Sequence, residues 1–132
     1  MISISKSYDF DAAHMLDNDM CTINENLAMF GKCNNLHGHT YKLTVEVSGE
    51  IDVATGMVLN YFTLDEVVKP IVDRELDHSY LNEVFPEILT TAENILMEIG
   101  KRLALKLPHN VKLQSITLQE TPKTTAKWTS DK

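Results

Sequence analysis

Two histidines and a cysteine lie close together in the stretch GKCNNLHGHTYKLTVEV, residues 31–47. Imidazole nitrogen and thiolate sulfur are ligands that zinc binds well, and a thiolate can also act as a nucleophile or base. The residue types therefore allow two kinds of chemistry. His37 and His39 could hold a metal ion, and Cys33 could be either a further ligand or a reactive thiol.

Side chains two residues apart on a β-strand point to the same side of the sheet. The alternation of apolar and polar residues over 41–47 predicts a strand, and if it continues backward, His37 and His39 lie on its inward face. His14 ends an earlier apolar stretch, YDFDAAH, and reaches the same place if the two strands pair antiparallel. Three neutral imidazoles suit zinc, and a fourth position left to water would make the site catalytic.

Spacing alone does not distinguish this catalytic site from two simpler arrangements. A His-x-His pair on a strand is more often a pair of hydrogen-bonded imidazoles than a metal site. If a metal does bind, Cys33 could complete a closed site of three histidines and one cysteine, which would be structural and inert. The protein would then be a non-catalytic zinc protein.

Four segments have the composition of β-strands and would position these side chains. They are residues 2–13, 41–47, 111–120 and roughly 124–129. Residues 15–34 lack a sustained period, so we expect a long functional or mobile excursion between the first two strands.

Two amphipathic helices are expected between the second strand and the third. The first begins near Thr63, with Glu66 at the spacing of a capping box, and Pro70 should bend it because proline lacks a backbone donor. The second begins near Thr90, with Glu93 as its capping-box partner, and ends at a proline. The order ββααββ predicts an α+β domain, a four-stranded antiparallel sheet with two helices on one face.

Length and composition limit the class of protein. The 132 residues suffice for one domain, residues 1–132, and a hydrophobic content of 43% allows a single core. A net charge of −7 without a basic stripe argues against nucleic-acid and acidic-membrane binding, and no apolar run is long enough to cross a membrane. Without an export signal, we expect a cytoplasmic protein with reduced cysteines. Open sheet edges favour oligomerisation.

Several short motifs, in this order and spacing, resemble the 6-pyruvoyl-tetrahydropterin synthase and 6-carboxy-tetrahydropterin synthase family over essentially the whole chain. The matching stretches are FDAAH at 10–14, CNNLHGHTY at 33–41, TGMVLNYFTL at 55–64, LDHSYLN at 76–82, TAEN at 91–94 and QETP at 119–122. The resemblance implies that His14, His37 and His39 bind zinc and that Cys33 is the catalytic thiol.

The resemblance also assigns four residues that could equally have ordinary structural roles. It implies that Asp77 and His78 assist catalysis, although polar residues closing a helix would look the same. It implies that Glu120 grips the pterin ring, although by itself Glu120 would be a solvated carboxylate at a strand end. Thr91 belongs to a helix cap that the family places beside the pterin.

The implied substrate is 7,8-dihydroneopterin triphosphate, and two products are possible. One enzyme type eliminates triphosphate to give the 6-pyruvoyl product. The other also releases acetaldehyde and leaves 6-carboxy-tetrahydropterin, an intermediate of queuosine biosynthesis. The three residues between Cys33 and His37 match the carboxy-forming pattern, whereas Asn60 and the run GEIDVATGMVLN are similar to the pyruvoyl-forming group. Motif counting favours the 6-carboxy enzyme.

The family fold implied by the resemblance is the tunnelling fold. Three subunits close a twelve-stranded barrel, and two such rings stack into a homohexamer with active sites between subunits. Such an assembly would cover the sheet edges that a single chain leaves open.

Overall fold

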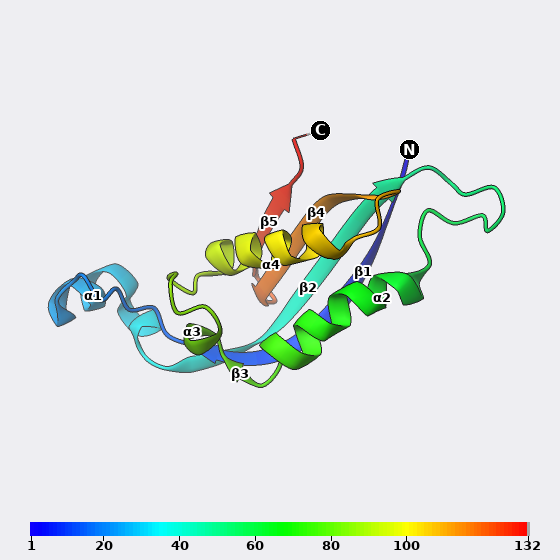
Figure 1. The fold of residues 1–132 in the computed structure, drawn as a ribbon. Helices are drawn as coiled ribbons and strands as arrows, with labels where there is room; N and C mark the ends of the chain where they lie inside the picture. Colours follow the sequence, from blue (N-terminus) through cyan, green and yellow to red (C-terminus); the bar gives the residue numbers. More distant parts are fainter. Residues whose placement is uncertain (132) are drawn as a thin grey trace.

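A five-stranded sheet organises residues 1–131, the part of the chain that the computed structural model describes (Figure 1). The strands are β1 (Ile2–His14), β2 (His37–Gly49), β3 (Ser79–Tyr80), β4 (Lys112–Thr121) and β5 (Thr124–Thr129). Their spatial order is β3-β1-β2-β4-β5, antiparallel except where β3 lies parallel to β1. The α+β class is confirmed. The prediction of four strands was wrong, because a two-residue edge strand has no periodic pattern to detect.

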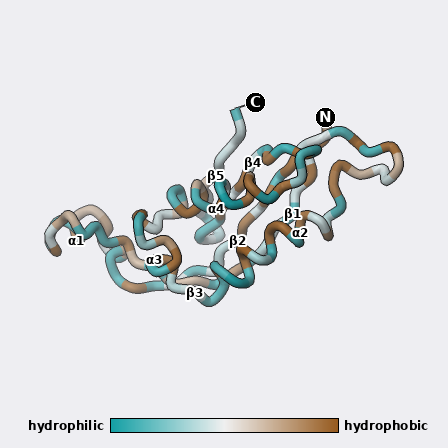
Figure 2. The backbone as a smooth tube through the Cα atoms, viewed as in Figure 1, coloured by the Kyte–Doolittle hydropathy of each residue, from teal (hydrophilic) through white to brown (hydrophobic). Residues whose placement is uncertain are grey.

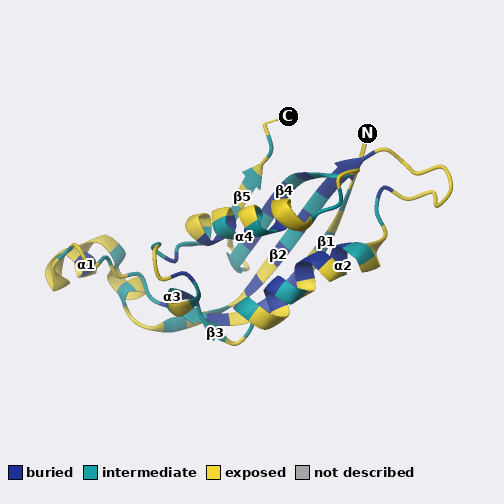
Figure 3. Cartoon of the chain, viewed as in Figure 1, coloured by how far each residue is buried: buried dark blue, intermediate teal, exposed yellow. Residues whose placement is uncertain are grey.

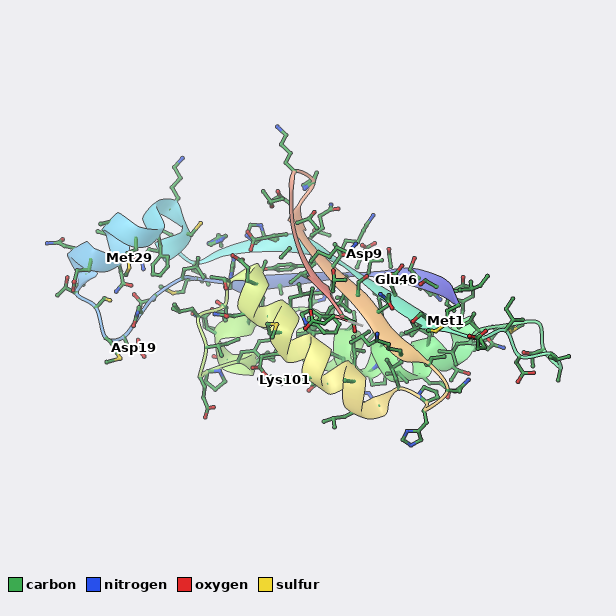
Figure 4. All side chains as sticks on the ribbon, turned by 90° about the horizontal axis from the view of Figure 1, so that it is seen from above. Met1, Asp9, Asp19, Met29, Glu46 and Lys101 are labelled. Atoms are coloured by element: carbon green, nitrogen blue, oxygen red, sulfur yellow. The ribbon has the colours of Figure 1, made fainter. Side chains whose placement is uncertain are left out.

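The helices are α1 (Ile23–Phe30), α2 (Tyr61–Lys69), α3 (Leu81–Val84) and α4 (Ala92–Lys106). α2 and α4 lie on the same side of the sheet, as predicted (Figures 1 and 4). Their inward residues and the inward residues of β1, β2 and β4 form one hydrophobic core. Buried positions therefore line the face of the sheet beneath the helices, and hydrophobic residues recur along β2 and α2 (Figures 2 and 3).

β1 and β2 pair antiparallel over their whole length, from Ile2 opposite Gly49 to His14 opposite His37. Alternate residues of β1 turn inward, and Tyr8, Phe10 and His14 are buried. This register confirms that β2 continues back to the histidines, and it places the ends of the two strands side by side.

The start of α2 differs from the predicted cap. Asn60 is the residue before the helix, and its side-chain oxygen accepts a hydrogen bond from the backbone N–H of Phe62 at 2.9 Å. The Thr63–Glu66 capping box was wrong because Thr63 lies inside the first turn. Pro70, predicted to bend the helix, marks the point where the α-helix gives way to a π-helical segment, Pro70–Leu76.

The start of α4 also differs by one residue from the prediction. Thr91, not Thr90, caps the helix, since its hydroxyl oxygen accepts from the backbone N–H of Asn94 at 3.2 Å. Glu93 is therefore one position too early to complete a capping box. Thr90 is buried and free to serve the site described below.

The predicted excursion contains an unpredicted helix, α1, which projects with its neighbouring turns as an arm beyond the sheet (Figure 1). Asp19 and Met29 mark this arm in Figure 4. A capping box joins Thr22 and Glu25, and the Asn26 side chain donates to the carbonyls of Asn18 and Thr22 at 3.1 Å each. Polar contacts of this kind order a short helix whose apolar residues Ile23, Leu27 and Met29 are exposed. Among residues 1–131 no helix is long and apolar enough to span a membrane.

Asp65 ties α2 to β1, and its effect on stability depends on pH. Its carboxylate accepts from the Tyr8 hydroxyl at 2.7 Å and from Lys6 Nζ at 2.9 Å, and these bonds hold the pKa of Asp65 below its ordinary value. Because the pKa of Asp65 is lower in the folded chain than in the unfolded chain, its carboxylate stabilises the fold at pH values above the unfolded pKa. This stabilisation is lost as the pH falls through the folded pKa.

Asp65→Asn is therefore expected to lower the free energy of unfolding by about 1 kcal/mol at pH 7, because the Lys6 partner is partly exposed and screened. The difference from wild type should shrink as pH falls below about 4. Urea titrations at pH 7 and pH 3 measure this difference in the free energy of unfolding. The variant Asp73→Asn, at an exposed carboxylate, is the control. An equal difference at both pH values would contradict the assignment.

Candidate functional site

Three histidines meet where the paired ends of β1 and β2 leave the core. His14 and His37 are direct cross-strand partners, and His39 follows on the same face of β2. One ligand nitrogen from each ring lies within 4.8 Å of the others. Within residues 1–131 this is the one group of histidine, cysteine or carboxylate side chains that could hold a metal ion. The predicted gathering of His14 with the other two is therefore present.

Backbone carbonyls fix the orientation of two of these rings. His14 Nδ1 lies 2.8 Å from the carbonyl oxygen of Thr90, and His37 Nδ1 lies 2.7 Å from that of Asn35. A carbonyl only accepts hydrogen bonds, so we assign the proton to Nδ1 in both rings, which leaves a lone pair on Nε2. A second partner of this kind is usual for a metal-binding imidazole.

The Nε2 atoms of His14 and His39 are buried and have no hydrogen-bond partner. Buried polar atoms in proteins are nearly always satisfied, so two orphan nitrogens side by side call for a ligand. Burial lowers the pKa values of both His14 and His39. The lowered pKa favours the neutral imidazole, which is the form that binds metals. The donor set fits a divalent ion such as zinc.

A polar network that the sequence did not predict holds the chain just after His14. The Asn82 side chain accepts from the backbone N–H of Met15 at 3.1 Å and donates to its carbonyl at 2.8 Å. The Thr90 hydroxyl donates to the Asn82 side-chain oxygen at 3.1 Å. Asn82 closes the motif LDHSYLN, which was the signal that could have marked it.

Glu120, near the end of β4, links the histidines to a neighbouring cleft. Its carboxylate oxygens lie 3.7 Å from His39 Nε2 and 3.9 Å from His14 Nε2, beyond hydrogen-bond distance. The cleft has a volume of about 630 Å³ and lies between the start of α4 and the β4–β5 hairpin. Glu120 and Thr91 are polar groups of its lining, and Leu96 and Trp128 are apolar ones. The structure thus brings together both residues predicted to bind the substrate.

Cys33 is exposed on a 3₁₀ turn, Gly31–Asn34, just before β2. Its carbonyl accepts from the backbone N–H of Leu16 at 2.8 Å, which anchors the turn to the chain after β1. The sulfur is not part of the three-histidine group. The geometry therefore leaves the thiol free, in contrast to the closed site in which it would be a ligand.

Asp77 and His78 form a pair at the opposite edge of β1, next to β3. His78 Nδ1 lies 2.9 Å from Asp77 Oδ2, and the backbone N–H of Asp11 donates to Asp77 Oδ1 at 2.9 Å. The bond from Asp11 and then the bond from His78 lower the pKa of Asp77. His78 has a φ of 58°, a left-handed conformation that is uncommon outside glycine and often found at functional sites.

No hydrogen bond or ion pair within the described chain joins Cys33 to Asp77 or His78. His78 is also exposed, with 79% of its side-chain surface accessible. A single chain therefore assembles the three histidines with Glu120 and Thr91, and it leaves the thiol and the Asp77–His78 pair as separate groups.

Tyr41, the first residue of the predicted strand 41–47, carries a hydroxyl beside the histidines, and its ring centroid lies 5.5 Å from that of His39. The side chain is fully buried two residues after His39, and its oxygen has no hydrogen-bond partner. Burial, followed by the negative charge of Glu120, raises the pKa of Tyr41, so the hydroxyl stays protonated.

The model of the 6-pyruvoyl tetrahydropterin synthase family matches residues 3–131. The chain belongs to this family. Human 6-pyruvoyl tetrahydrobiopterin synthase is 39% identical over 123 residues, which cover 89% of this chain and 84% of the human protein. The 6-carboxy-5,6,7,8-tetrahydropterin synthase of Haemophilus influenzae is 35% identical over 145 residues, which cover 92% of this chain and 94% of the relative.

A solved structure supports the same placement. The 6-pyruvoyl tetrahydropterin synthase of Caenorhabditis elegans superimposes with a TM-score of 0.90 at 30% identity, covering 98% of this chain and 96% of that one. The named relatives are pterin synthases, which are lyases, and this chain belongs with these enzymes. The resemblance drawn from the short motifs is confirmed at the level of the family.

Proposed function

We propose that this chain is a zinc-dependent lyase that converts 7,8-dihydroneopterin triphosphate and one water molecule to 6-carboxy-5,6,7,8-tetrahydropterin, acetaldehyde and triphosphate. The observation that carries the proposal is the position of Glu120. This carboxylate lines the cleft and also lies 3.7 Å from an unpartnered histidine nitrogen. A ligand held in the cleft by Glu120 would therefore have its side chain beside the three histidines.

Glu120 and Thr91 would bind the pterin ring. A carboxylate with two acceptor oxygens matches the amino group and adjacent ring N–H of a pterin, which together form a planar pair of donors. The Thr91 hydroxyl oxygen already accepts from Asn94, which leaves its hydrogen free to donate to a ring acceptor. The apolar side chains of Leu96 and Trp128 in the same lining suit a flat aromatic ring.

His14, His37 and His39 would hold the zinc ion, and the ligand nitrogens of His14 and His39 have no other partner in the fold. Bound zinc supplies Lewis acidity, which lowers the pKa of hydroxyl groups that it contacts. Cys33 would move protons at the carbon atoms of the substrate side chain, and Asp77 would orient His78 as a second acid-base group.

An oligomer would bring these groups together. No hydrogen bond or ion pair joins Cys33 to the Asp77–His78 pair within the described chain, so the proposed homohexamer would form each active site from more than one subunit. The outer edge of β5 is available for pairing, and β3 covers β1 only at Ala12 and Ala13. Such edges form intermolecular sheets readily. We place the enzyme in the cytoplasm and in queuosine biosynthesis.

The 6-pyruvoyl reaction is the second candidate, because the human 6-pyruvoyl enzyme is 39% identical to the chain. Asn60, which favours this reaction by its motif, is the cap of α2. The carboxy-forming pattern usually has aspartate at this position. Aspartate would cap a helix equally well, so the residue at position 60 says little about the product. The three-residue spacing from Cys33 to His37 supports the 6-carboxy product.

Product analysis tests the proposal directly. Zinc-loaded protein incubated with 7,8-dihydroneopterin triphosphate is expected to release acetaldehyde and triphosphate in equal amounts, measured by trapping the aldehyde and by ion chromatography. Triphosphate without acetaldehyde would favour the 6-pyruvoyl reaction. Release of neither product would contradict both candidate reactions.

A further inference from the structure

Three buried side-chain atoms in the described chain have no hydrogen-bond partner: His14 Nε2, His39 Nε2 and the Tyr41 hydroxyl. The proposed metal ion accounts for the two nitrogens. The Tyr41 hydroxyl, on a side chain with 0% exposure, is left without a role in the fold. An unsatisfied buried hydroxyl costs stability, so it indicates a partner that arrives with a ligand.

The surroundings of Tyr41 place its hydroxyl in the site and not in the general core. Its ring stacks on Phe10, with centroids 4.9 Å apart, and meets the rings of His39 and His14 edge-on at 5.5 and 6.3 Å. The pairing of β2 with β4 ends at Lys42 opposite Gln119, and Tyr41 and Glu120 are the next residues beyond that last pair.

The Glu120 carboxylate can accept a hydrogen bond from the Tyr41 hydroxyl. In the chain alone its carboxylate leans toward His39 and His14, at 3.7 and 3.9 Å, and no hydrogen bond joins it to Tyr41. An ionised carboxylate and a phenol beside each other in a buried place form a strong, charge-assisted hydrogen bond.

We propose that Tyr41 is a positioning residue for ligand binding: in the bound state its hydroxyl donates to the Glu120 carboxylate and holds it toward the cleft. The inference rests on the proposed function, since it takes the ligand in the cleft to be a pterin. It adds a residue whose role is exerted through Glu120 and not through contact with the ligand.

Tyr41→Phe is the matched test, because it removes the hydroxyl and keeps the ring on Phe10. The zinc-loaded variant is expected to keep its zinc and to unfold at the wild-type temperature or above it, since the lost hydroxyl had no partner. Its affinity for neopterin, measured by fluorescence titration, should fall about 10-fold. The exposed Tyr61→Phe serves as the control and should bind neopterin like wild type.

A second variant separates action through Glu120 from direct contact with the ligand. Glu120→Ala removes the acceptor and should itself weaken neopterin binding, and adding Tyr41→Phe to it should cause no further loss. An additional 10-fold loss in that background would overturn the proposed route, as would unchanged binding by Tyr41→Phe alone. Failure of the wild-type protein to bind neopterin would instead overturn the proposed function, and the inference with it.

Discussion

His37→Ala is expected to lower zinc affinity by more than about 100-fold and to abolish turnover. Loss of an outer-shell partner already costs about 10- to 100-fold in affinity, and loss of a ligand should cost more. His37 is the best of the three histidines for this test because it is only half-buried, so its removal leaves a smaller cavity than removal of His14. Competition against a chromophoric chelator measures the affinity.

The control for this experiment is His109→Ala. His109 is exposed and lies outside the three-histidine group, so the variant should bind zinc like wild type. If His37→Ala also kept its zinc, the three histidines would not form the metal site, and the two buried nitrogens would have to serve some purpose besides metal binding.

Cys33→Ala is expected to retain zinc while the turnover number falls by about 10²- to 10⁴-fold, the usual contribution of a general acid or base. The reason is geometric, since the thiol is exposed on its own turn and is not among the grouped ligands. Metal content after dialysis and steady-state rates on 7,8-dihydroneopterin triphosphate measure the two effects separately.

Cys21→Ala, at a cysteine on the arm, is the matched control and should change neither quantity. Loss of zinc from Cys33→Ala would favour the closed, non-catalytic site with sulfur as the fourth ligand. Full turnover with full zinc would remove Cys33 from the chemistry.

The meeting of the three histidines could be predicted because it depends on local rules. Alternation along β2 fixes the face of His37 and His39, and a single antiparallel pairing brings His14 to them. The hydrophobic stripes of α2 and α4 likewise predicted two helices on one face, although the caps were misplaced. Several residues near each helix start could act as the cap, and tertiary contacts decide among them.

Other features of the site depend on contacts between distant segments, which no local pattern reports. Thr90 is a plausible cap by sequence, but the fold buries it so that its carbonyl orients His14. Asn82 holds Met15 from 67 positions away. The Tyr41 hydroxyl is buried and unsatisfied only in the folded chain, where its ring packs against Phe10, His14 and His39. The strand β3, with two residues, and the helix α1, with eight, are too short for a periodic pattern to be detected.

X-ray absorption at the zinc K edge of the zinc-loaded wild-type protein tests the central claim most directly. Three histidine nitrogens at about 2.0–2.1 Å, one oxygen and no sulfur are predicted, because His14, His37 and His39 form the ligand group and Cys33 lies outside it. A sulfur ligand at about 2.3 Å, or fewer than three nitrogens, would contradict it.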